Sequence, residues 1–348
     1  VWGTRLEVEA ALLNLRMRYD PSTVAPKEVT LDVLVNQYLN ARKKNGEPRS
    51  PYSRHKELGR YNRHIRPVLG TRIANSITTQ DLNLVYNQLQ ESLSPSTIQK
   101  INAVLGAAYE LGISFGHLSK NPTKRTRRPS IIQLPTQAPS AEAVQSHLEL
   151  LHDNDHELAL AVLVTSRLAI RRNELIALRW KRIDLQERWL EICEGITHTT
   201  GIGAQSTPTK TGKLGWARYP LGDTLVEALG DHYTRYEKVM ADIGVEPTDE
   251  AFVLSPSPTR ESPWYGDSLT KRLAHHMDHH PELQRFTLLD LRHYAATELV
   301  AGGASLVHAK AMLRHQSTKT TERYYVAVRD QQLLQESLAL QERLDHRA

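Results

Sequence analysis

The sequence predicts a mainly α-helical protein with a small β-sheet, in which a helical domain precedes a larger α+β domain. Three observations lead to this prediction. The 348 residues exceed the size of one typical hydrophobic core. Apolar residues recur at helical spacing through 29–118 and through most of 140–348. Only two short runs, 188–193 and 216–221, are strand-like.

Composition and charge favour a polyanionic partner and a reducing compartment. The formal net charge is +5 and the sequence pI is about 9.2. Cys193 is the only cysteine, which excludes an internal disulfide. No apolar run is long enough to span a membrane, and no signal peptide is recognisable. We therefore expect a cytoplasmic protein.

The first 119 residues predict a short N-terminal segment, 1–25, and a helical domain, 26–119. The segment has the apolar spacing of the end of a helix. The domain has the pattern of about four helices. Thr78 or Thr79 can cap one of them, and Ser94-Pro95 can begin another.

A strongly basic stretch from residue 42 to residue 72 lies within this domain. It holds ten lysines and arginines against two acids. A charge run is usually a solvated helix face, but this excess favours a surface that follows a phosphate backbone. The predicted phosphate contacts are Arg42, Lys43, Lys44, Arg54, Arg60 and Arg63.

The next segment, 120–139, predicts a basic interdomain linker. It has no hydrophobic period and contains four prolines. A plain tether would not need its cations, so we expect it to cross a phosphate backbone as well. The predicted contacts here are Lys124, Arg125, Arg127 and Arg128.

Residues 140–348 predict the α+β domain and end in an amphipathic helix over 329–345. Ser140 can cap the first helix. The other expected helices are 141–152, 155–166, 172–178, 223–242, 266–277, 289–301 and 304–313.

Several residues in this domain are candidates for chemistry. Arg171 and Glu174 are flanked by apolar residues, so we expect them near the core, where a guanidinium needs an anion. Lys210 lies between the two strand-like runs, in the position of a hairpin turn. Arg292 follows at the start of a helix, and His315 precedes Tyr324 by nine residues.

Two histidine pairs, 275–276 and 279–280, offer an alternative. Histidines four residues apart on a helix can share a metal ion. Pro281 ends that helix, and no acidic or cysteine ligand is spaced to complete the site. We therefore predict no metal and no other cofactor.

These motifs together resemble the tyrosine recombinases of the phage integrase family. The boxes that carry the resemblance are 170–175, 209–213, 290–293 and 313–324, in the order of the family. The helical domain resembles the core-type DNA-binding domain of the family at 62–70, 77–82 and 94–97. Residues 1–25 are similar to the end of an arm-binding domain, of which they would be a remnant.

The resemblance implies that Tyr324 attacks a DNA phosphodiester and forms a 3′-phosphotyrosine. Arg171 and Arg292 would then hold the phosphate oxygens, Lys210 would protonate the leaving oxygen, and His315 would assist. Glu174 would orient the site. The adjacent Tyr325 competes for the nucleophile's role by sequence alone, and the interval from His315 selects Tyr324.

The resemblance also implies a setting for this activity. The partners would be double-stranded DNA attachment sites, a homo-tetramer on synapsed DNA, a host DNA-bending protein and a directionality factor, in the nucleoid of a bacterial host. The reaction would integrate or excise a mobile element without ATP or metal.

One departure from the family pattern keeps other functions open. The second arginine box of the family reads His-x-x-Arg, whereas the first position here is Leu289. A leucine cannot donate a hydrogen bond to a phosphate. The alternatives are a DNA-binding protein with a degenerate recombinase site and a type IB topoisomerase-like enzyme that relaxes DNA. A metal hydrolase built on the histidine pairs ranks last.

Overall fold

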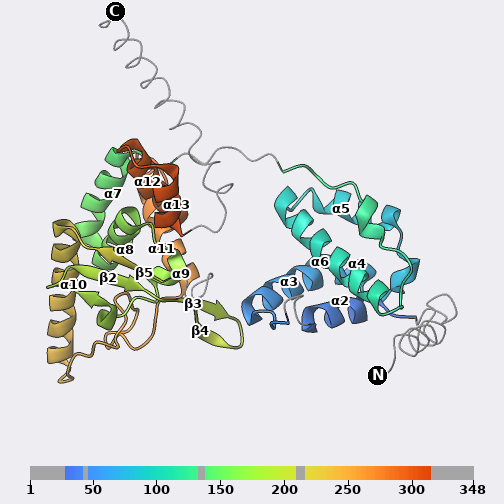
Figure 1. The fold of residues 1–348 in the computed structure, drawn as a ribbon, viewed down its shortest axis with the longest axis horizontal. Helices are drawn as coiled ribbons and strands as arrows, with labels where there is room; N and C mark the ends of the chain where they lie inside the picture. Colours follow the sequence, from blue (N-terminus) through green and yellow to red (C-terminus); the bar gives the residue numbers. More distant parts are fainter. Residues whose placement is uncertain (1–27, 42–45, 132–137, 209–215, 315–348) are drawn as a thin grey trace, which may run out of the picture. The chain divides into compact units, whose positions relative to one another are not determined.

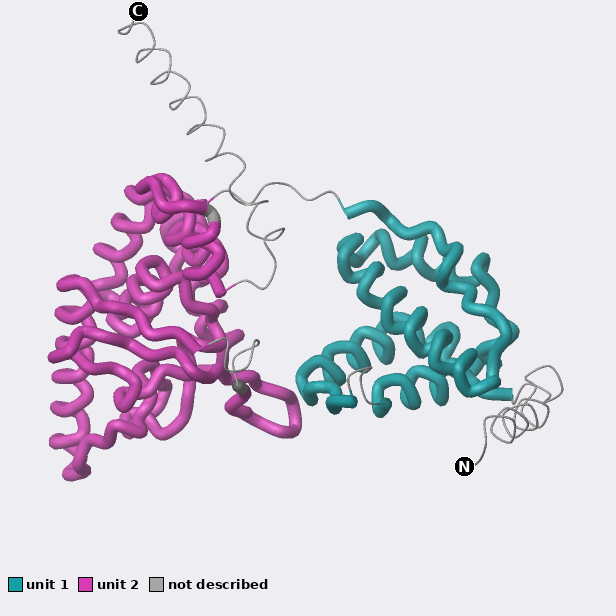
Figure 2. Tube along the Cα trace, viewed as in Figure 1, with its two compact units in different colours: residues 1–133 teal, residues 134–348 magenta. Residues whose placement is uncertain are grey.

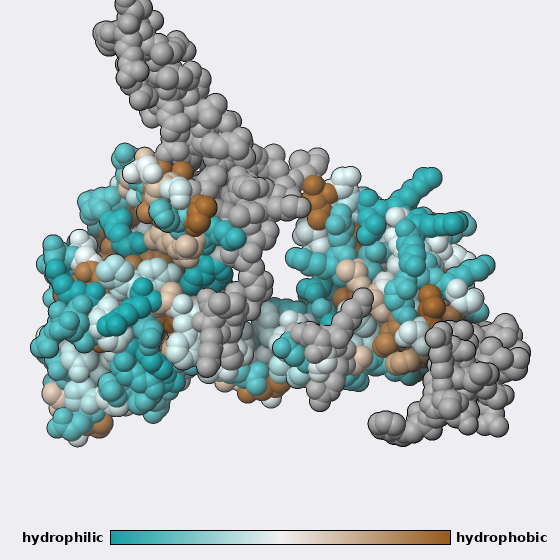
Figure 3. Space-filling view, viewed as in Figure 1, coloured by the Kyte–Doolittle hydropathy of each residue, from teal (hydrophilic) through white to brown (hydrophobic). Residues whose placement is uncertain are grey.

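The computed structural model describes residues 28–41, 46–131, 138–208 and 216–314. The chain forms two compact units, residues 1–133 and 134–348 (Figure 2). None of the described helices is long and apolar enough to cross a membrane. Hydrophilic side chains cover most of the visible surface of both units, and hydrophobic ones are scattered among them (Figure 3).

The first unit is a bundle of helices, as predicted. Its elements are α2 (Leu31–Asn40), α3 (Pro51–His64), α4 (Arg66–Leu69), η1 (Ala74–Ser76), α5 (Thr79–Leu89), α6 (Pro95–Ser114) and η2 (Pro122–Arg125). Thr78 begins α5 with a capping box, in which Thr78 and Asp81 each accept a hydrogen bond from the other's backbone N–H. Ser94 precedes α6, but its hydroxyl contacts Ser96 and Thr97 rather than a backbone N–H.

The core of this helical unit combines aliphatic side chains with tyrosines. Leu34, Ile98 and Leu105 are fully buried. The hydroxyl of Tyr86 donates to Asn102 Oδ1 at 3.0 Å, and that of Tyr109 donates to Ala74 O at 3.0 Å. These buried hydroxyls therefore have partners and do not weaken the core.

The predicted linker, 120–139, packs on the helical unit along its described first part. The hydroxyl of Thr126 donates to Asn102 Oδ1 at 3.0 Å. Gln99 Nε2 donates to Pro129 O at 3.0 Å. Arg127 N donates to Asn83 Oδ1 at 2.8 Å. This part of the segment therefore belongs to the helical unit and is not an extended tether.

The second unit combines helices with two small sheets (Figure 1). Its helices are α7 (Ala141–Asn154), α8 (His156–Leu168), α9 (Arg172–Leu175), η3 (Trp180–Arg182), α10 (Asp223–Asp242), α11 (Gly266–His279), α12 (Leu288–Ala301) and α13 (Leu306–Leu313). Its strands are β1 (Ile183–Asp184), β2 (Trp189–Ile192), β3 (Glu194–Thr199), β4 (Gly203–Pro208) and β5 (Ala217–Pro220). The mainly helical fold with a small sheet is confirmed.

Helix α8 is the centre of the second unit. Residues 160–166 are buried on every side, which is the pattern of a helix inside a core. α8 contacts α7, α10, α11 and α12. Ala143 N donates to the hydroxyl oxygen of Ser140 at 3.1 Å, which caps the start of α7, as predicted.

The sheets differ in part from the prediction. β2 pairs antiparallel with β1 and β5, so the two predicted runs do meet. A separate hairpin, β3–β4, was not predicted, and Gly201 and Gly203 supply its turn with φ of 81° and 86°. Lys210 follows β4 and lies outside the described residues, so the turn predicted there stays a prediction. The helix predicted over 172–178 is only the single turn α9.

Candidate active site

Arg171 is held by a tight turn between α8 and α9. Ala169 ends α8 in the left-handed conformation, with φ of 51°, and this reverses the chain. The backbone N–H of Arg171 donates to Glu174 Oε2 at 2.8 Å, and its Nη1 donates to Glu174 Oε1 at 2.8 Å. The Arg171 side chain is 26% exposed and that of Glu174 is 4% exposed. Glu174 thus holds the guanidinium of Arg171 in place, while part of that guanidinium stays accessible to a ligand.

Arg292 lies on α12 and donates to the same carbonyl group as Arg171, that of Leu313. A capping box between Thr287 and Asp290 starts this helix. Arg292 is buried; its Nη1 donates to Ala169 O and its Nη2 donates to Leu313 O. Burial and the neighbouring Arg171 lower the pKa of Arg292 to about 9, so the group stays protonated at neutral pH.

The two arginines share the C-terminal end of α13. Arg171 Nη2 donates to Leu313 O at 3.3 Å and to Arg314 O at 2.9 Å. Carbonyl groups at the end of a helix lack partners within the helix, so cations bind there favourably. The chain continues directly from Arg314 to His315. Arg314, the last described residue before His315, therefore contacts Arg171 through its carbonyl oxygen.

Arg314 was not predicted as a site residue. Its Nη2 donates to Glu174 Oε2, and its guanidinium lies 5.8 Å from the centre of the Tyr219 ring. The Tyr219 hydroxyl donates to Met312 O at 3.1 Å, and burial raises the pKa of this tyrosine. The position of Arg314 beside His315 was the one signal in the sequence that could have drawn attention to it.

Three further predicted catalytic residues, Lys210, His315 and Tyr324, lie outside the described residues, as does the predicted helix over 329–345. The structure thus brings Arg171, Glu174 and Arg292 together and leaves the positions of those three as predictions. Leu289, at the departure from the family pattern, is 59% exposed on the first turn of α12. His293 is buried, and burial lowers its pKa to about 4, so it is neutral at pH 7.

One histidine of the two pairs, His276, packs against another element of its unit. His276 Nε2 lies 3.0 Å from Nδ1 of the buried His147, whose Nε2 lies 3.2 Å from Gln284 O. Burial and the neighbouring His147 lower the pKa of His276 to about 4. Among the described residues, no group of three or more histidine, cysteine or acidic side chains could hold a metal ion.

The predicted phosphate contacts of the helical unit lie at its surface where they are described. Arg54, Arg63, Lys124, Arg125, Arg127 and Arg128 are exposed, and Arg60 is half-buried. Lys124 Nζ is 3.0 Å from Glu110 Oε1. Arg42, Lys43 and Lys44 lie outside the described residues. Three other arginines of this unit, Arg49, Arg66 and Arg72, pair with carboxylates.

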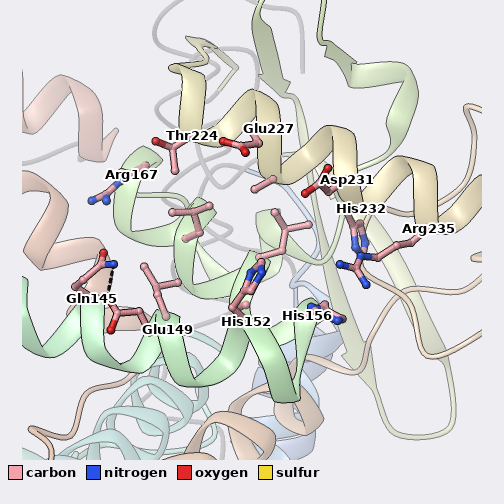
Figure 4. Close-up of a pocket in the computed structure, with 15 residues that line it drawn as sticks. Gln145, Glu149, His152, His156, Arg167, Thr224, Glu227, Asp231, His232 and Arg235 are labelled. Atoms are coloured by element: carbon pink, nitrogen blue, oxygen red, sulfur yellow. Dashed lines mark hydrogen bonds between the residues drawn. The ribbon is translucent and has the colours of Figure 1, made fainter.

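A separate cavity of about 340 Å³ lies among α7, α8 and α10 (Figure 4). Leu148, Leu160 and Leu163 are among its lining residues. His152, Glu227 and other polar side chains also line it. The arginine cluster, which consists of Arg171, Glu174, Arg292 and Arg314, does not line it.

The fold and the buried arginine cluster are those of an integrase-type catalytic domain. The model of the phage integrase family matches residues 140–332, which is more than half of the chain, and the protein belongs to this family. The family prediction is confirmed.

Known proteins resemble the chain in sequence and in fold. A XerC-like tyrosine recombinase of Caldanaerobacter subterraneus subsp. tengcongensis is 25% identical over 167 residues, which are 44% of this chain and 41% of the relative. The match thus spans less than half the length of that curated relative.

Solved integrase structures share the fold. The Tn1549 transposon integrase in complex with a circular intermediate DNA has a TM-score of 0.70 at 17% identity, over 88% of this chain and 99% of that one. A lambda integrase tetramer bound to a Holliday junction has a TM-score of 0.59 at 17% identity, over 92% of this chain and 87% of that one.

Proposed function

We propose that the protein is a site-specific DNA recombinase that cleaves and rejoins DNA through a 3′-phosphotyrosine on Tyr324. The observation that carries the proposal is the convergence of Arg171 and Arg292 on the end of α13, from which the chain runs directly into the His315–Tyr324 segment. Membership of the phage integrase family supports it. The resemblance to the Tn1549 transposon integrase supports integration or excision of a mobile element.

The arginines would stabilise the charge that develops during phosphoryl transfer. The Tyr324 oxygen attacks the phosphorus as its hydroxyl proton passes to His315 or to water. The bond to the 5′-oxygen breaks, and that oxygen takes a proton from Lys210. Arg171 and Arg292 donate to the two non-bridging oxygens, and His315 assists. Glu174 orients Arg171. The adduct keeps the energy of the phosphodiester, so rejoining needs no ATP, and the cations take the place of a metal ion.

The helical unit would hold the DNA duplex beside this site. Its exposed cations, with those of the linker 120–139, would contact phosphates of an attachment site. The lambda integrase tetramer on a Holliday junction supports assembly as a homo-tetramer. A host DNA-bending protein and a directionality factor are further proposed partners, in the nucleoid of a bacterial host.

Covalent capture tests the proposal. The protein is mixed with a nicked duplex pool of random sequence and denatured in detergent, and DNA-linked protein is collected. We expect adducts from the wild type and from Tyr325→Phe, and none from Tyr324→Phe, because only Tyr324 supplies the attacking oxygen. Loss of adducts in Tyr325→Phe alone would overturn the assignment of the nucleophile.

A second candidate function is a DNA-binding protein with a degenerate site, and the exposed Leu289 favours it. No adduct from the wild type, together with salt-sensitive DNA binding, would support this function. Relaxation of supercoiled DNA by a single bound copy, without exchange between two sites, would instead support a topoisomerase-like activity.

A further inference from the structure

We propose that Arg314 is a positioning residue of the phosphate site, which holds Glu174 in place so that Glu174 can orient Arg171. This inference rests on the proposed function. It adds a third arginine to the two that the motifs identify, and it gives that arginine a role that acts through Glu174 rather than by contact with the DNA.

The carboxylate of Glu174 accepts hydrogen bonds from two arginines. Its Oε1 accepts from Arg171 Nη1 at 2.8 Å, and its Oε2 accepts from Arg171 N at 2.8 Å and from Arg314 Nη2. The side chains of Arg314 and Glu174 are 6% and 4% exposed. A buried carboxylate depends strongly on its partners because water cannot replace them. Removing Arg314 would therefore let Glu174 shift, and Arg171 with it.

The backbone at Arg314 indicates that its side chain has a specific use. Its φ is 49°, in the left-handed region that favours glycine and is commonly occupied by glycine at the end of a helix. A non-glycine residue there is held against its own preference by its surroundings. The ion pair with Glu174 and the Tyr219 ring at 5.8 Å supply that hold.

The charges of the cluster suit an anionic ligand. Among the described side chains, Arg171 and Arg314 pair with the Glu174 carboxylate, and the charge of Arg292 interacts with that of Glu174. Burial lowers the pKa of Arg292 most, and the neighbouring Arg171 and Arg314 lower it further, whereas Glu174 raises it. A phosphodiester beside Arg171 would bring a negative charge to these guanidinium groups.

The test compares two substrates that differ at one non-bridging oxygen of the cleaved phosphate, which a methyl group replaces in the second. One is the duplex site recovered by covalent capture. The other carries a methylphosphonate there, which has no negative charge. The rate of adduct formation is measured for the full-length wild type, Arg314→Gly and Arg171→Ala under single-turnover conditions. Adducts from the wild type on the ordinary site establish the proposed function before the variants are compared.

We expect Arg314→Gly to slow cleavage of the ordinary site by about 10- to 100-fold, less than the direct loss of a phosphate contact. The defect should shrink on the methylphosphonate, as it should in Arg171→Ala, because the charge that Arg171 offsets is absent. An equal loss on both substrates, or no loss on the ordinary site, would overturn the inference. Arg314→Lys, which retains the charge but not the planar fork, should fall between the wild type and Arg314→Gly.

Arg260→Gly is the matched control. Arg260 also has a left-handed backbone, with φ of 54°, and its Nη1 lies 3.0 Å from Glu157 Oε1. It belongs to the same unit and has no contact with the arginine cluster. This variant should change cleavage of the two substrates by the same factor. A shrinking defect on the methylphosphonate in Arg260→Gly as well would overturn the inference, because the effect would then reflect general loosening of the unit.

Discussion

The cations of the two units are held in opposite ways. In the helical unit, Arg63 and Arg127 lie at the surface, in contact with water. In the second unit, 134–348, which we call the catalytic unit, Arg292 is 3% exposed and the side chain of Arg314 is 6% exposed. Exposed cations attract DNA over a distance that salt shortens, whereas buried cations are fixed in place before the substrate arrives. We therefore expect the exposed cations to hold DNA and the buried ones to act on it.

The removal of a buried cation should have the largest effect on rate. Arg292→Ala should slow adduct formation at saturating DNA by about 10²–10³-fold, which is typical of losing one preorganised donor. The dissociation constant for DNA should change little. Single-turnover rates and binding isotherms measure the two quantities, and the exposed Arg235→Ala serves as control. A defect confined to the dissociation constant would erase the distinction between the two kinds of cation.

Acid should unfold the catalytic unit before the helical unit. Burial lowers the pKa of His232 and of His293 from 6.5 to about 4. The unfolded chain then binds more protons between these values, so stability from neutral histidines is lost as the pH falls from about 6.5 to about 4. In the helical unit, hydrogen bonds from Arg72 hold the pKa of Asp81 well below its usual range, so that contribution is lost only below about pH 4.

Fluorescence distinguishes the two events. Tryptophan is absent from residues 28–131, and four of the five tryptophans lie between 180 and 264. The fluorescence transition should therefore occur at higher pH than the final loss of helical circular dichroism. His232→Gln, which can still donate to Val253 O but does not titrate, should move the fluorescence transition to lower pH. A single transition below pH 4 would contradict the ordering.

The smallest effect is expected from surface cations. Replacing Arg125, Arg127 and Arg128 with alanine should weaken DNA binding and make the plot of log affinity against log salt shallower by about 0.9 per lost phosphate contact. Cleavage at saturating DNA should not change. Arg66→Ala should leave the slope nearly unaltered, because Arg66 is already paired with Asp32. An unchanged slope in the triple variant would remove these residues from the DNA-binding surface.

Local patterns in the sequence predicted the parts of the fold that local interactions determine. Apolar spacing and caps such as Thr78 predicted the helices. The β3–β4 hairpin had no comparable signal, because β4 consists of small and polar residues. The packing of the linker on the helical unit depends on Asn83 of α5 and Asn102 of α6, which lie 44 and 24 residues before their linker partners in the sequence. Neither contact leaves a periodic trace.

The same limit applied to the site. The motifs predicted that Arg171, Glu174 and Arg292 belong together, and the structure places them around one carboxylate and one helix end. Arg314 lies within one of the motifs, yet its partner Glu174 lies 140 residues away in the sequence. Only the folded chain shows that the two meet.

We propose that the arginines around Glu174 serve the transfer of a phosphoryl group to Tyr324. The most direct measurement is to digest the captured protein–DNA adduct and to identify the modified peptide by mass spectrometry. We expect a peptide that carries a nucleotide on Tyr324, linked through a 3′-phosphate. A 5′-phosphate linkage, or a nucleotide on another side chain, would contradict it.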